Sequence, residues 1–343
     1  MQAKVYVLIL SYRNAADTIE CLESVLRLEY PDFEVVVCDN ASPDGALDGL
    51  LEWAQGNRPG QPAAAAMRRF SEPPLPQPVP HRLLLAPAAG PVEPEPRLTF
   101  IRCAVNTGYA GGNNVGLRHI LARGDAGYVW VLNNDTVVER DALAAVVARA
   151  EAEPAVGLWG SLVRYYHEPD QVQAFGGGRY RRWLGVSYYV TESKTGDEHL
   201  DYVLGAATLV SVRFLREVGL MTEDYFLYFE ELDWAERAKR AGFRLGVCGA
   251  SVVFHKEGAS TGIARDPRLK TPFADYYVMR NRILFARRFH PWTRVGIYAG
   301  ILLSVGLRLQ RGQKRNARVI GRLCWQMFWN GFPPAECHPV RCD

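Results

Sequence analysis

The sequence predicts an α/β fold, in which a mostly parallel sheet is flanked by helices and followed by a helical C-terminal extension that is both apolar and basic. Two observations predict the sheet. Short β-branched runs alternate with helical patterns in the first half of the chain, and they are apolar at successive positions, as in strands covered on both faces. A third observation predicts the extension: segment 265–322 carries 14 Lys or Arg against two Asp or Glu, a local charge of +12, whereas the rest of the chain carries −9.

Length and composition exclude several classes of protein. The 343 residues allow one large or two modest domains, and 48% hydrophobic with 22% charged residues excludes a wholly disordered or fibrous chain. The seven cysteines include no Cys-x-x-Cys pair, so we expect neither a disulfide framework nor a zinc site. No apolar run reaches the roughly 18 residues that span a bilayer, and no cleavable leader is evident, so we expect a cytoplasmic protein.

The first half of the chain supplies most of the predicted sheet. A helical pattern with Asp17 as a candidate N-cap covers 17–28, and a second covers 114–122. Ligands of parallel sheets bind at the carboxyl ends of the strands, where Asp39 and Asp135 stand. The expected strands of this half are Val5–Leu10, Phe33–Cys38, Leu98–Cys103 and Tyr128–Leu132.

We divide the chain at residue 265. Residues 1–265 form the predicted main domain, which is interrupted at 55–97 by a Pro- and Ala-rich insertion that holds eleven of the 21 prolines. This composition indicates a flexible or polyproline-like segment on the rim of the sheet, and a tolerated surface insertion is favoured over a docking peptide. Residues 266–343 form the C-terminal helical segment. Later elements of the main domain are a strand-like run at Asp201–Val212, a helix at Glu230–Ala241, and strands at Leu245–Cys248 and Val252–Phe254.

Two segments that follow strands indicate which kind of nucleotide the protein could bind. Asp39 ends the second strand, where its carboxylate can accept a hydrogen bond from a ribose hydroxyl or a nucleobase imide; taken alone, it is better explained as a turn residue. The first strand is followed by Ser11-Tyr12-Arg13-Asn14 rather than Gly-x-Gly-x-x-Gly, which disfavours a nicotinamide or flavin dinucleotide.

A glycine-rich segment leads into the second helix. It reads Asn106-Thr107-Gly108-Tyr109-Ala110-Gly111-Gly112-Asn113-Asn114. Glycines allow the backbone to approach a ligand, and a helix N-terminus favours phosphate. A glycine-rich turn between strand and helix explains the same segment about equally well.

Two further segments have carboxylates or imidazole at strand ends. Asn133-Asn134-Asp135 follows the fourth strand and suits a divalent cation, Mg²⁺ or Mn²⁺, held by one carboxylate plus substrate phosphates, although a plain turn is the alternative. His255 ends a late strand and is a candidate further ligand of that cation.

Three carboxylates begin the helix at 230. Glu230, Glu231 and Asp233 stand among aromatic residues, which indicates a walled cleft, and a carboxylate there can act as general base toward a sugar hydroxyl. The alternative is a surface capping arrangement, because helix N-termini favour acidic residues.

Together these segments resemble the family 2 glycosyltransferases of GT-A fold, specifically the rhamnosyltransferase-like bacterial branch. The resemblance covers residue 3 to about 290 without the insertion, and it implies a Rossmann-like sheet. It also implies that Asp39 pairs with a uracil or thymine ring, that Asp135 and His255 bind the metal, and that Glu231 is the catalytic base. The further candidates for nucleotide-sugar binding are Ser11, Tyr12, Asn14, Asn106, Gly108, Gly111, Gly112, Asn113, Asn133 and Asn134.

The chain departs from the family pattern at two positions. The metal motif reads Asn-Asn-Asp and so lacks its first carboxylate. The residue at the base position, Glu231, is one methylene longer than the family's aspartate, so Glu230 or Asp233 is an alternative base.

These features predict an inverting glycosyltransferase that moves a sugar, with rhamnose as the first candidate, from a dTDP- or UDP-linked donor to a cell-surface or lipid-linked glycan. A sugar-phosphate nucleotidyltransferase is the alternative enzyme, but its Gly-rich loop with Arg or Lys after the first strand is absent. A membrane-associated scaffold without enzymatic activity is the third hypothesis, and it leaves the acidic residues and His255 unexplained.

The C-terminal segment predicts an attachment to membranes. Val295–Leu307 is apolar, flanked by arginines and too short to span a bilayer, which fits a helix lying in the interface, with Trp325, Phe328 and Trp329 as anchors. A buried helix with a solvated basic neighbour is the alternative. We favour the anionic inner face of the cell membrane over nucleic acid, because no nucleic-acid-binding motif accompanies the charge.

Overall fold

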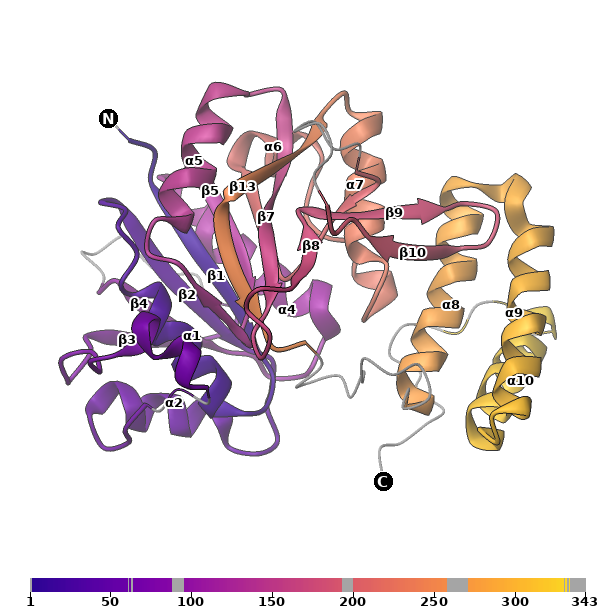
Figure 1. Cartoon of the computed structure of the whole chain (residues 1–343), viewed down its shortest axis with the longest axis horizontal. Coiled ribbons are helices and arrows are strands. Elements are labelled where there is room, and N and C mark those ends of the chain that lie inside the picture. Colours follow the sequence, from indigo (N-terminus) through magenta and orange to yellow (C-terminus); the bar gives the residue numbers. More distant parts are fainter. Residues whose placement is uncertain are drawn as a thin grey trace.

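The computed structural model describes residues 2–60, 62, 64–87, 96–192, 200–257, 271–329, 331 and 333. Its main sheet has ten strands: β1 (Val5–Ser11), β2 (Phe33–Asp39), β3 (His81–Leu85), β4 (Leu98–Arg102), β5 (Tyr128–Asn133), β6 (Thr136–Val138), β7 (Val156–Tyr165), β8 (Val172–Phe175), β12 (Ala207–Ser211) and β13 (Arg244–His255). They lie in the order β3-β4-β2-β1-β5-β12-β7-β13-β6, with β8 paired to β7 (Figure 1).

The first part of the sheet, from β3 to β5, is entirely parallel, and β13 is parallel to β7. β6, β8 and β12 pair with their neighbours in antiparallel fashion. The predicted α/β class with a mostly parallel sheet is therefore confirmed. A second, three-stranded sheet consists of β9 (Gly177–Arg181), β10 (Val186–Tyr189) and β11 (Tyr202–Val203).

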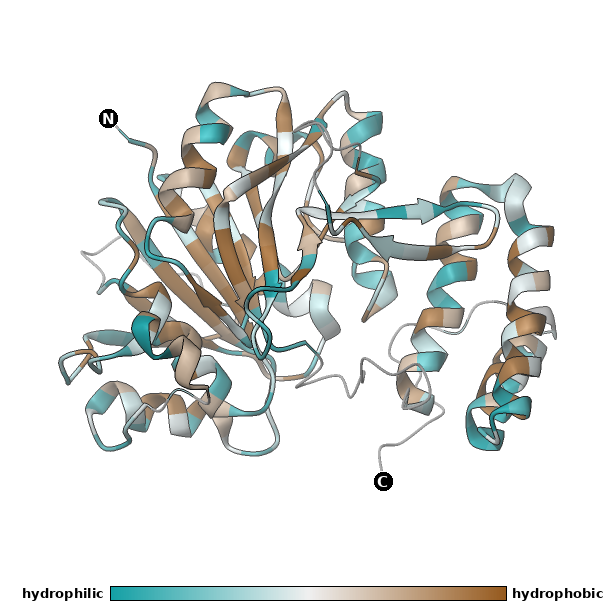
Figure 2. Cartoon of the chain, in the orientation of Figure 1, coloured by the Kyte–Doolittle hydropathy of each residue, from teal (hydrophilic) through white to brown (hydrophobic). Residues whose placement is uncertain are grey.

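Helices cover both faces of the main sheet. They are α1 (Ala15–Val25), α2 (Ala46–Gln55), α3 (Arg68–Ser71), α4 (Gly108–Arg123), α5 (Ala142–Ala152), α6 (Val212–Glu217) and α7 (Glu230–Arg240). Along β1, Val7 and Ile9 belong to one apolar cluster with α1, α2 and α5, whereas Tyr6 and Leu8 belong to a second with α4, α6 and α7. Because each face is buried, successive residues of β1 are all apolar, and Figure 2 shows the central strands as the hydrophobic interior.

Several predicted boundaries were wrong. The strand-like run Asp201–Val212 is divided between β11 in the small sheet and β12 in the main sheet, and Val212 begins α6. α1 begins at Ala15, and Asp17 lies inside its first turn, where it pairs with Lys256 instead of capping the helix. α4 begins at Gly108, six residues before the predicted start, so the glycine-rich segment is itself helical. The two late strands are one strand, β13, with a register shift between Cys248 and Val252.

The helical form of the glycine-rich segment has a packing cause. A Cβ on Gly112 would lie 2.4 Å from Leu10 Cδ1, and one on Gly116 would lie 2.3 Å from Leu8 Cδ1. These glycines therefore let α4 approach β1 closely, a role that outweighs their poor helix propensity.

The Pro- and Ala-rich insertion is partly regular. Its strand β3 pairs in parallel with β4 and forms the edge of the main sheet, and α3 and a short 3-10 helix, Ala65–Met67, precede β3. The predicted position on the rim agrees with this edge strand, but a wholly flexible or polyproline-like segment does not. Residues 88–95 of the insertion lie outside the described residues.

The C-terminal segment forms three helices: α8 (Pro272–Phe289), α9 (Arg294–Gln310) and α10 (Lys314–Trp329). They share an apolar cluster that includes Ile283, Ile297 and Ile320, and they lie beside the β9–β10 hairpin at one end of the molecule (Figure 1). A buried ion pair adds to this packing, because Arg308 Nη2 lies 2.8 Å from Asp275 Oδ1. In the described part of the chain, no helix combines the length and apolarity needed to cross a membrane.

Candidate active site

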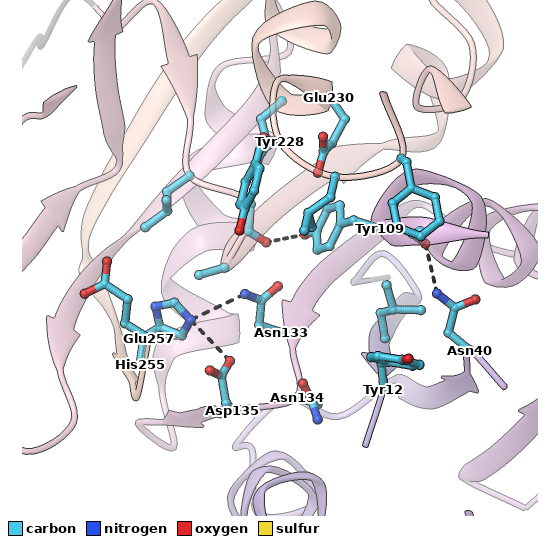
Figure 3. A pocket seen from close by; sticks show the side chains of 18 of the residues that line it. Tyr12, Asn40, Tyr109, Asn133, Asn134, Asp135, Tyr228, Glu230, His255 and Glu257 are labelled. Atoms are coloured by element: carbon cyan, nitrogen blue, oxygen red, sulfur yellow. Dashed lines mark hydrogen bonds and ion pairs between the residues drawn. The ribbon is translucent and has the colours of Figure 1, made fainter. Parts of the chain in front are cut away.

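A cleft opens at the carboxyl ends of β1 and β5, between the starts of α4 and α7 (Figure 3). The predicted residues that line it are Tyr12, Asn106, Gly108, Asn133, Asn134, Asp135, Glu230, Glu231 and His255. The topology explains this convergence, because β1 and β5 are adjacent parallel strands whose carboxyl ends share one edge.

Asp135 and His255 form a close pair on one wall of the cleft. Asp135 follows β5 and His255 ends β13, and His255 Nε2 lies 3.2 Å from Asp135 Oδ1, with both side chains buried. Burial opposes both charges, but the attraction between the two groups outweighs it, so that the pKa of Asp135 is lowered and the pKa of His255 is raised.

The donor atoms of this pair fit a divalent cation. His255 Nδ1 lies 3.0 Å from Gln173 Oε1, an acceptor that keeps this nitrogen protonated and directs Nε2 toward Asp135. A cation would therefore take the place of the Nε2 proton between one imidazole nitrogen and one carboxylate oxygen. Among the described residues no group of three His, Cys, Asp or Glu is arranged to hold a metal, so substrate phosphates and water would complete the coordination.

Sequence analysis did not predict a role for Asn40, although its side chain connects the end of β2 with the glycine-rich segment that begins at Asn106. Its Nδ2 donates to Asn106 Oδ1 at 2.9 Å and to the Gly108 carbonyl at 3.0 Å, and its Oδ1 accepts from the Thr107 N–H at 3.1 Å. Asn106 Oδ1 also accepts from the Gly108 N–H at 2.9 Å. Its place directly after Asp39 was the signal available in the sequence.

Asp39 lies behind Asn40 at the end of β2. It is 4% exposed, Oδ2 accepts a weak hydrogen bond from the Ser42 N–H at 3.3 Å, and Oδ1 has no partner among the described residues. Burial raises the pKa of this carboxyl. A buried carboxylate oxygen without a partner is an acceptor available to a ligand.

Glu230 and Glu231 line the wall of the cleft formed by α7, and Figure 3 shows Glu230 across the cleft from Asp135. Glu230 is 2% exposed, and burial together with the charge of Glu231 raises its pKa far above the usual range. Burial also raises the pKa of Glu231, which is less buried. Burial and the neighbouring charge therefore favour the protonated form of Glu230 more strongly than that of Glu231.

Asp233 does not line the cleft, which disfavours it as the alternative base. Its carboxylate accepts from Thr222 Oγ1 at 2.6 Å, Arg237 Nε at 2.7 Å, Tyr225 Oη at 3.0 Å and Arg288 Nη1 at 2.9 Å. The side chain is fully buried behind α7. Because both carboxylate oxygens are hydrogen-bonded inside the protein, this side chain stabilises the fold and does not face the cleft.

Five other predicted residues do not line the cleft. Gly111 and Gly112 serve helix packing, because a Cβ on either would meet Thr107 or Leu10. The others use their side chains inside the protein: Ser11 Oγ lies 3.1 Å from Thr18 Oγ1, Asn14 Nδ2 bonds to Asp17, and Asn113 Nδ2 donates to the Tyr109 carbonyl at 3.0 Å. The aromatic lining includes Phe226 and Tyr228, which belong to the aromatic residues predicted to wall the cleft, and also Tyr109, Tyr189 and Phe273, which sequence analysis did not assign.

Gly108 lies where the start of α4 contacts the turn before α7. Its φ is +75°, and a Cβ there would lie 2.1 Å from the Phe226 carbonyl oxygen, which accepts from the Tyr109 N–H at 2.7 Å. Only glycine meets both conditions without displacing the turn.

Gly108→Ala is therefore expected to destabilise the fold by about 3 kcal/mol or more, since backbone strain and a backbone clash add. Gly124, at the other end of α4, is the matched control, because it has φ +78° but open space around its Cβ position. Gly124→Ala should cost only about 1–2 kcal/mol. Urea denaturation of both variants measures the difference, and equal losses would show that Phe226 does not restrict this position.

The fold and cleft define an α/β protein that brings a buried Asp–His pair and two glutamates, Glu230 and Glu231, to one site. The glycosyl transferase family 2 model matches residues 6–62 and 86–219, more than half of the chain. The chain belongs to this family.

Curated relatives are similar at low identity. A low-salt glycan biosynthesis hexosyltransferase, Agl10, from Haloferax volcanii is 22% identical over 185 residues, which cover 54% of this chain and 59% of that protein. An N-acetylglucosaminyl-diphospho-decaprenol L-rhamnosyltransferase from Mycobacterium tuberculosis is 23% identical over 261 residues, 67% of this chain and 82% of that protein. The chain thus spans less than two thirds of the first relative's length.

Solved structures confirm the GT-A fold. A mannosyltransferase from Pyrobaculum calidifontis, in complex with GDP-Man and Mn²⁺, matches with a TM-score of 0.51 at 17% identity, over 96% of this chain and 88% of its own. GalNAc-T7 with UDP, GalNAc and Mn²⁺ matches with a TM-score of 0.55 at 14% identity, over 81% of this chain and 48% of its own.

Proposed function

We propose that the chain is an inverting, metal-dependent glycosyltransferase that moves a sugar from a nucleotide-diphosphate donor to a glycan or lipid-linked acceptor. One observation carries the proposal: a single cleft has Glu230 and Glu231 on one wall and the Asp135–His255 pair on another. The first wall suits removal of a proton from an acceptor, and the second suits a diphosphate with its cation.

In the proposed reaction, an acceptor hydroxyl oxygen attacks the anomeric carbon of the donor. The bond between that carbon and the diphosphate oxygen breaks, and the nucleoside diphosphate leaves with the electron pair. Glu231 takes the hydroxyl proton, and burial together with the charge of Glu231 raises the pKa of its neighbour Glu230, which disfavours a second negative charge beside it. A Mg²⁺ or Mn²⁺ ion bound by Asp135 and His255 would supply positive charge to the leaving diphosphate.

The nucleotide is proposed to bind beside Asp39 and Asn40. The free Oδ1 of Asp39 can accept from the imide N–H of a uracil or thymine ring, which supports a UDP or dTDP donor. Asn40, held by Asn106 and Gly108, fixes the edge of the pocket next to it.

Rhamnose is the first candidate sugar and a lipid-linked glycan the first candidate acceptor. Both follow from the similarity to the mycobacterial rhamnosyltransferase and from the resemblance to that branch of the family. The test is a panel of UDP-, dTDP- and GDP-linked sugars, assayed for thermal stabilisation and for release of nucleoside diphosphate with Mn²⁺. Release of pyrophosphate instead would support the nucleotidyltransferase alternative, and no effect of any donor would contradict the proposal.

We also propose that the C-terminal helices attach the enzyme to an anionic membrane, on its inner face. Between its two polar ends the outward side of α9 is largely apolar, and its exposed residues include Val295, Tyr298, Leu302, Leu303 and Leu309. The inward side, with Ile297 and Ile301, packs in the helical cluster. One side of α9 therefore packs in the protein and the other is exposed. The buried-helix alternative describes the first side, and the interfacial-helix prediction describes the second.

The cations of this segment are also divided between the interior and the surface. Arg280, Arg282 and Arg308 are buried, and Arg288 is paired with Asp233 and Asp224, so less positive charge faces outward than the sequence suggested. On α10 the rings of Trp325 and Trp329 lie 5.6 Å apart on an exposed side. Among the described residues of this segment, the exposed cations besides the paired Arg288 are Arg287, Arg294, Arg311, Lys314, Arg315, Arg318 and Arg322.

Replacing Leu302, Leu303, Trp325 and Trp329 by serine is expected to weaken binding to phosphatidylserine-containing vesicles at least about tenfold, because exposed apolar side chains supply interfacial affinity. Vesicle co-sedimentation measures this, and salt should weaken wild-type binding as well. The control is Leu83→Ser with Leu85→Ser, which removes exposed leucines from β3 at the sheet edge. Equal binding by both variants would leave α9 and α10 without a membrane role.

A further inference from the structure

The turn between Tyr225 and Phe229 has an unusual backbone. Phe226, Tyr228 and Phe229 have φ values of +64°, +69° and +78°, although none is glycine. Bulky residues rarely adopt this left-handed conformation, so surrounding contacts must hold the turn. The turn leads directly into Glu230 and Glu231, and it therefore sets the direction in which both side chains enter the cleft.

Asn281, in the middle of α8, makes the contacts that hold this turn. Its side chain is fully buried, and its Nδ2 donates to the carbonyl oxygens of Tyr225 at 2.9 Å, Leu227 at 2.7 Å and Tyr228 at 2.9 Å. Two amide hydrogens are thus shared among three carbonyls of one turn. Its Oδ1 accepts from Arg280 Nη1 at 2.7 Å, which fixes the orientation of the amide.

The turn is fixed from the opposite side by α4 and supported by a second contact from α8. The Tyr109 N–H donates to the Phe226 carbonyl at 2.7 Å, and the Phe226 ring stacks on Tyr277 of α8 with centroids 5.0 Å apart. Removing Asn281 would release the carbonyls on the α8 side and allow the turn to relax toward an unstrained backbone. Glu231 would then move relative to the acceptor while Asp135 and His255, on other elements, would stay in place.

We propose that Asn281 is a positioning residue for the transfer reaction: its amide holds the turn 225–228 in the conformation that directs Glu231 toward the acceptor hydroxyl. This inference rests on the proposed function, because it requires Glu231 to be the base. With this role, the C-terminal segment contributes to the transfer reaction as well as to the proposed membrane-binding surface.

The test is a double-mutant cycle with Asn281→Ala and Glu231→Gln in the full chain. Misplacement of a reacting group by about 1 Å can cost on the order of 10²-fold, so Asn281→Ala should lower kcat about 10- to 100-fold with little change in donor KM. If Asn281 acts through Glu231, it should lower kcat much less in the Glu231→Gln background. A purely structural role would give the same factor in both backgrounds.

Asn316→Ala is the matched control. Asn316 is a buried asparagine of α10 whose Nδ2 donates to Asp275 Oδ2 at 2.7 Å, away from the turn. Asn316→Ala should lower the melting temperature about as much as Asn281→Ala does, but it should leave kcat unchanged. If Asn281→Ala does not fold, Asn281→Leu replaces it in the cycle, since its side chain is similar in size but has no group that can donate to the carbonyls.

The outcomes separate the two proposals. An additive cycle, or normal kcat in Asn281→Ala beside an inactive Glu231→Gln variant, overturns the role of Asn281 and leaves the proposed function intact. Wild-type kcat in Glu231→Gln overturns the proposed function, and the role of Asn281 falls with it.

Discussion

Glu231→Gln is expected to lower kcat about 10²- to 10⁴-fold, the usual contribution of a general base. Gln preserves the size and most hydrogen bonds of the side chain but cannot take the acceptor proton. Donor affinity should change little, because the donor is proposed to bind beside Asp39, Asn40 and Asp135. Steady-state kinetics with saturating donor measure the effect.

Glu230→Gln is the control for this prediction, since the neighbouring side chain lines the same cleft. Burial and the charge of Glu231 raise the pKa of Glu230 and so favour its uncharged form, and an uncharged amide at this position should cost far less than the change at Glu231. If Glu230→Gln were inactive and Glu231→Gln active, the base would be Glu230. If both variants stayed active, base catalysis at this wall of the cleft would be wrong.

Asp135→Ala is expected to abolish metal-dependent turnover, with a loss of about two to three orders of magnitude. A bound cation contributes several kcal/mol to stabilising the charge of a leaving group, and the loss of one of two protein ligands should remove most of it. Activity measured over a chelator-controlled Mn²⁺ titration tests this, together with Mn²⁺ affinity from electron paramagnetic resonance.

Asp125→Ala is a matched control, because Asp125 is also an ion-paired aspartate with a lowered pKa, bonded to Lys4 at 2.7 Å outside the cleft. This variant should keep the wild-type Mn²⁺ dependence. Wild-type activity in Asp135→Ala at every Mn²⁺ concentration would place the cation elsewhere.

Much of the sheet could be predicted because burial on both faces leaves a simple pattern. The strands β1, β2, β4 and β5 are apolar at nearly every position, and the polar residues that follow them mark the edge where the cleft opens. The same pattern predicted four residues that line the cleft, because each stands near the end of a strand or at the start of a helix: Glu230, Glu231, Asp135 and His255.

Other features depend on packing that a local pattern does not show. The glycines of α4 indicate a turn by propensity, and only the approach to Leu8 and Leu10 explains why they are helical. Asp233 has the same local signature as Glu231, and its four partners come from segments up to 55 residues away. Asn281 is one polar residue in a helix rich in arginine, and nothing local connects it with a turn more than 50 residues earlier.

The configuration of the transferred sugar tests the central claim most directly. Once the panel has identified a donor, proton NMR of the first product gives the anomeric configuration before mutarotation or further reaction, and phosphorus NMR identifies the co-product. Single displacement with Glu231 as base predicts a product of opposite anomeric configuration to the donor, formed together with the nucleoside diphosphate. A product with the donor's own configuration, or release of pyrophosphate, would contradict it.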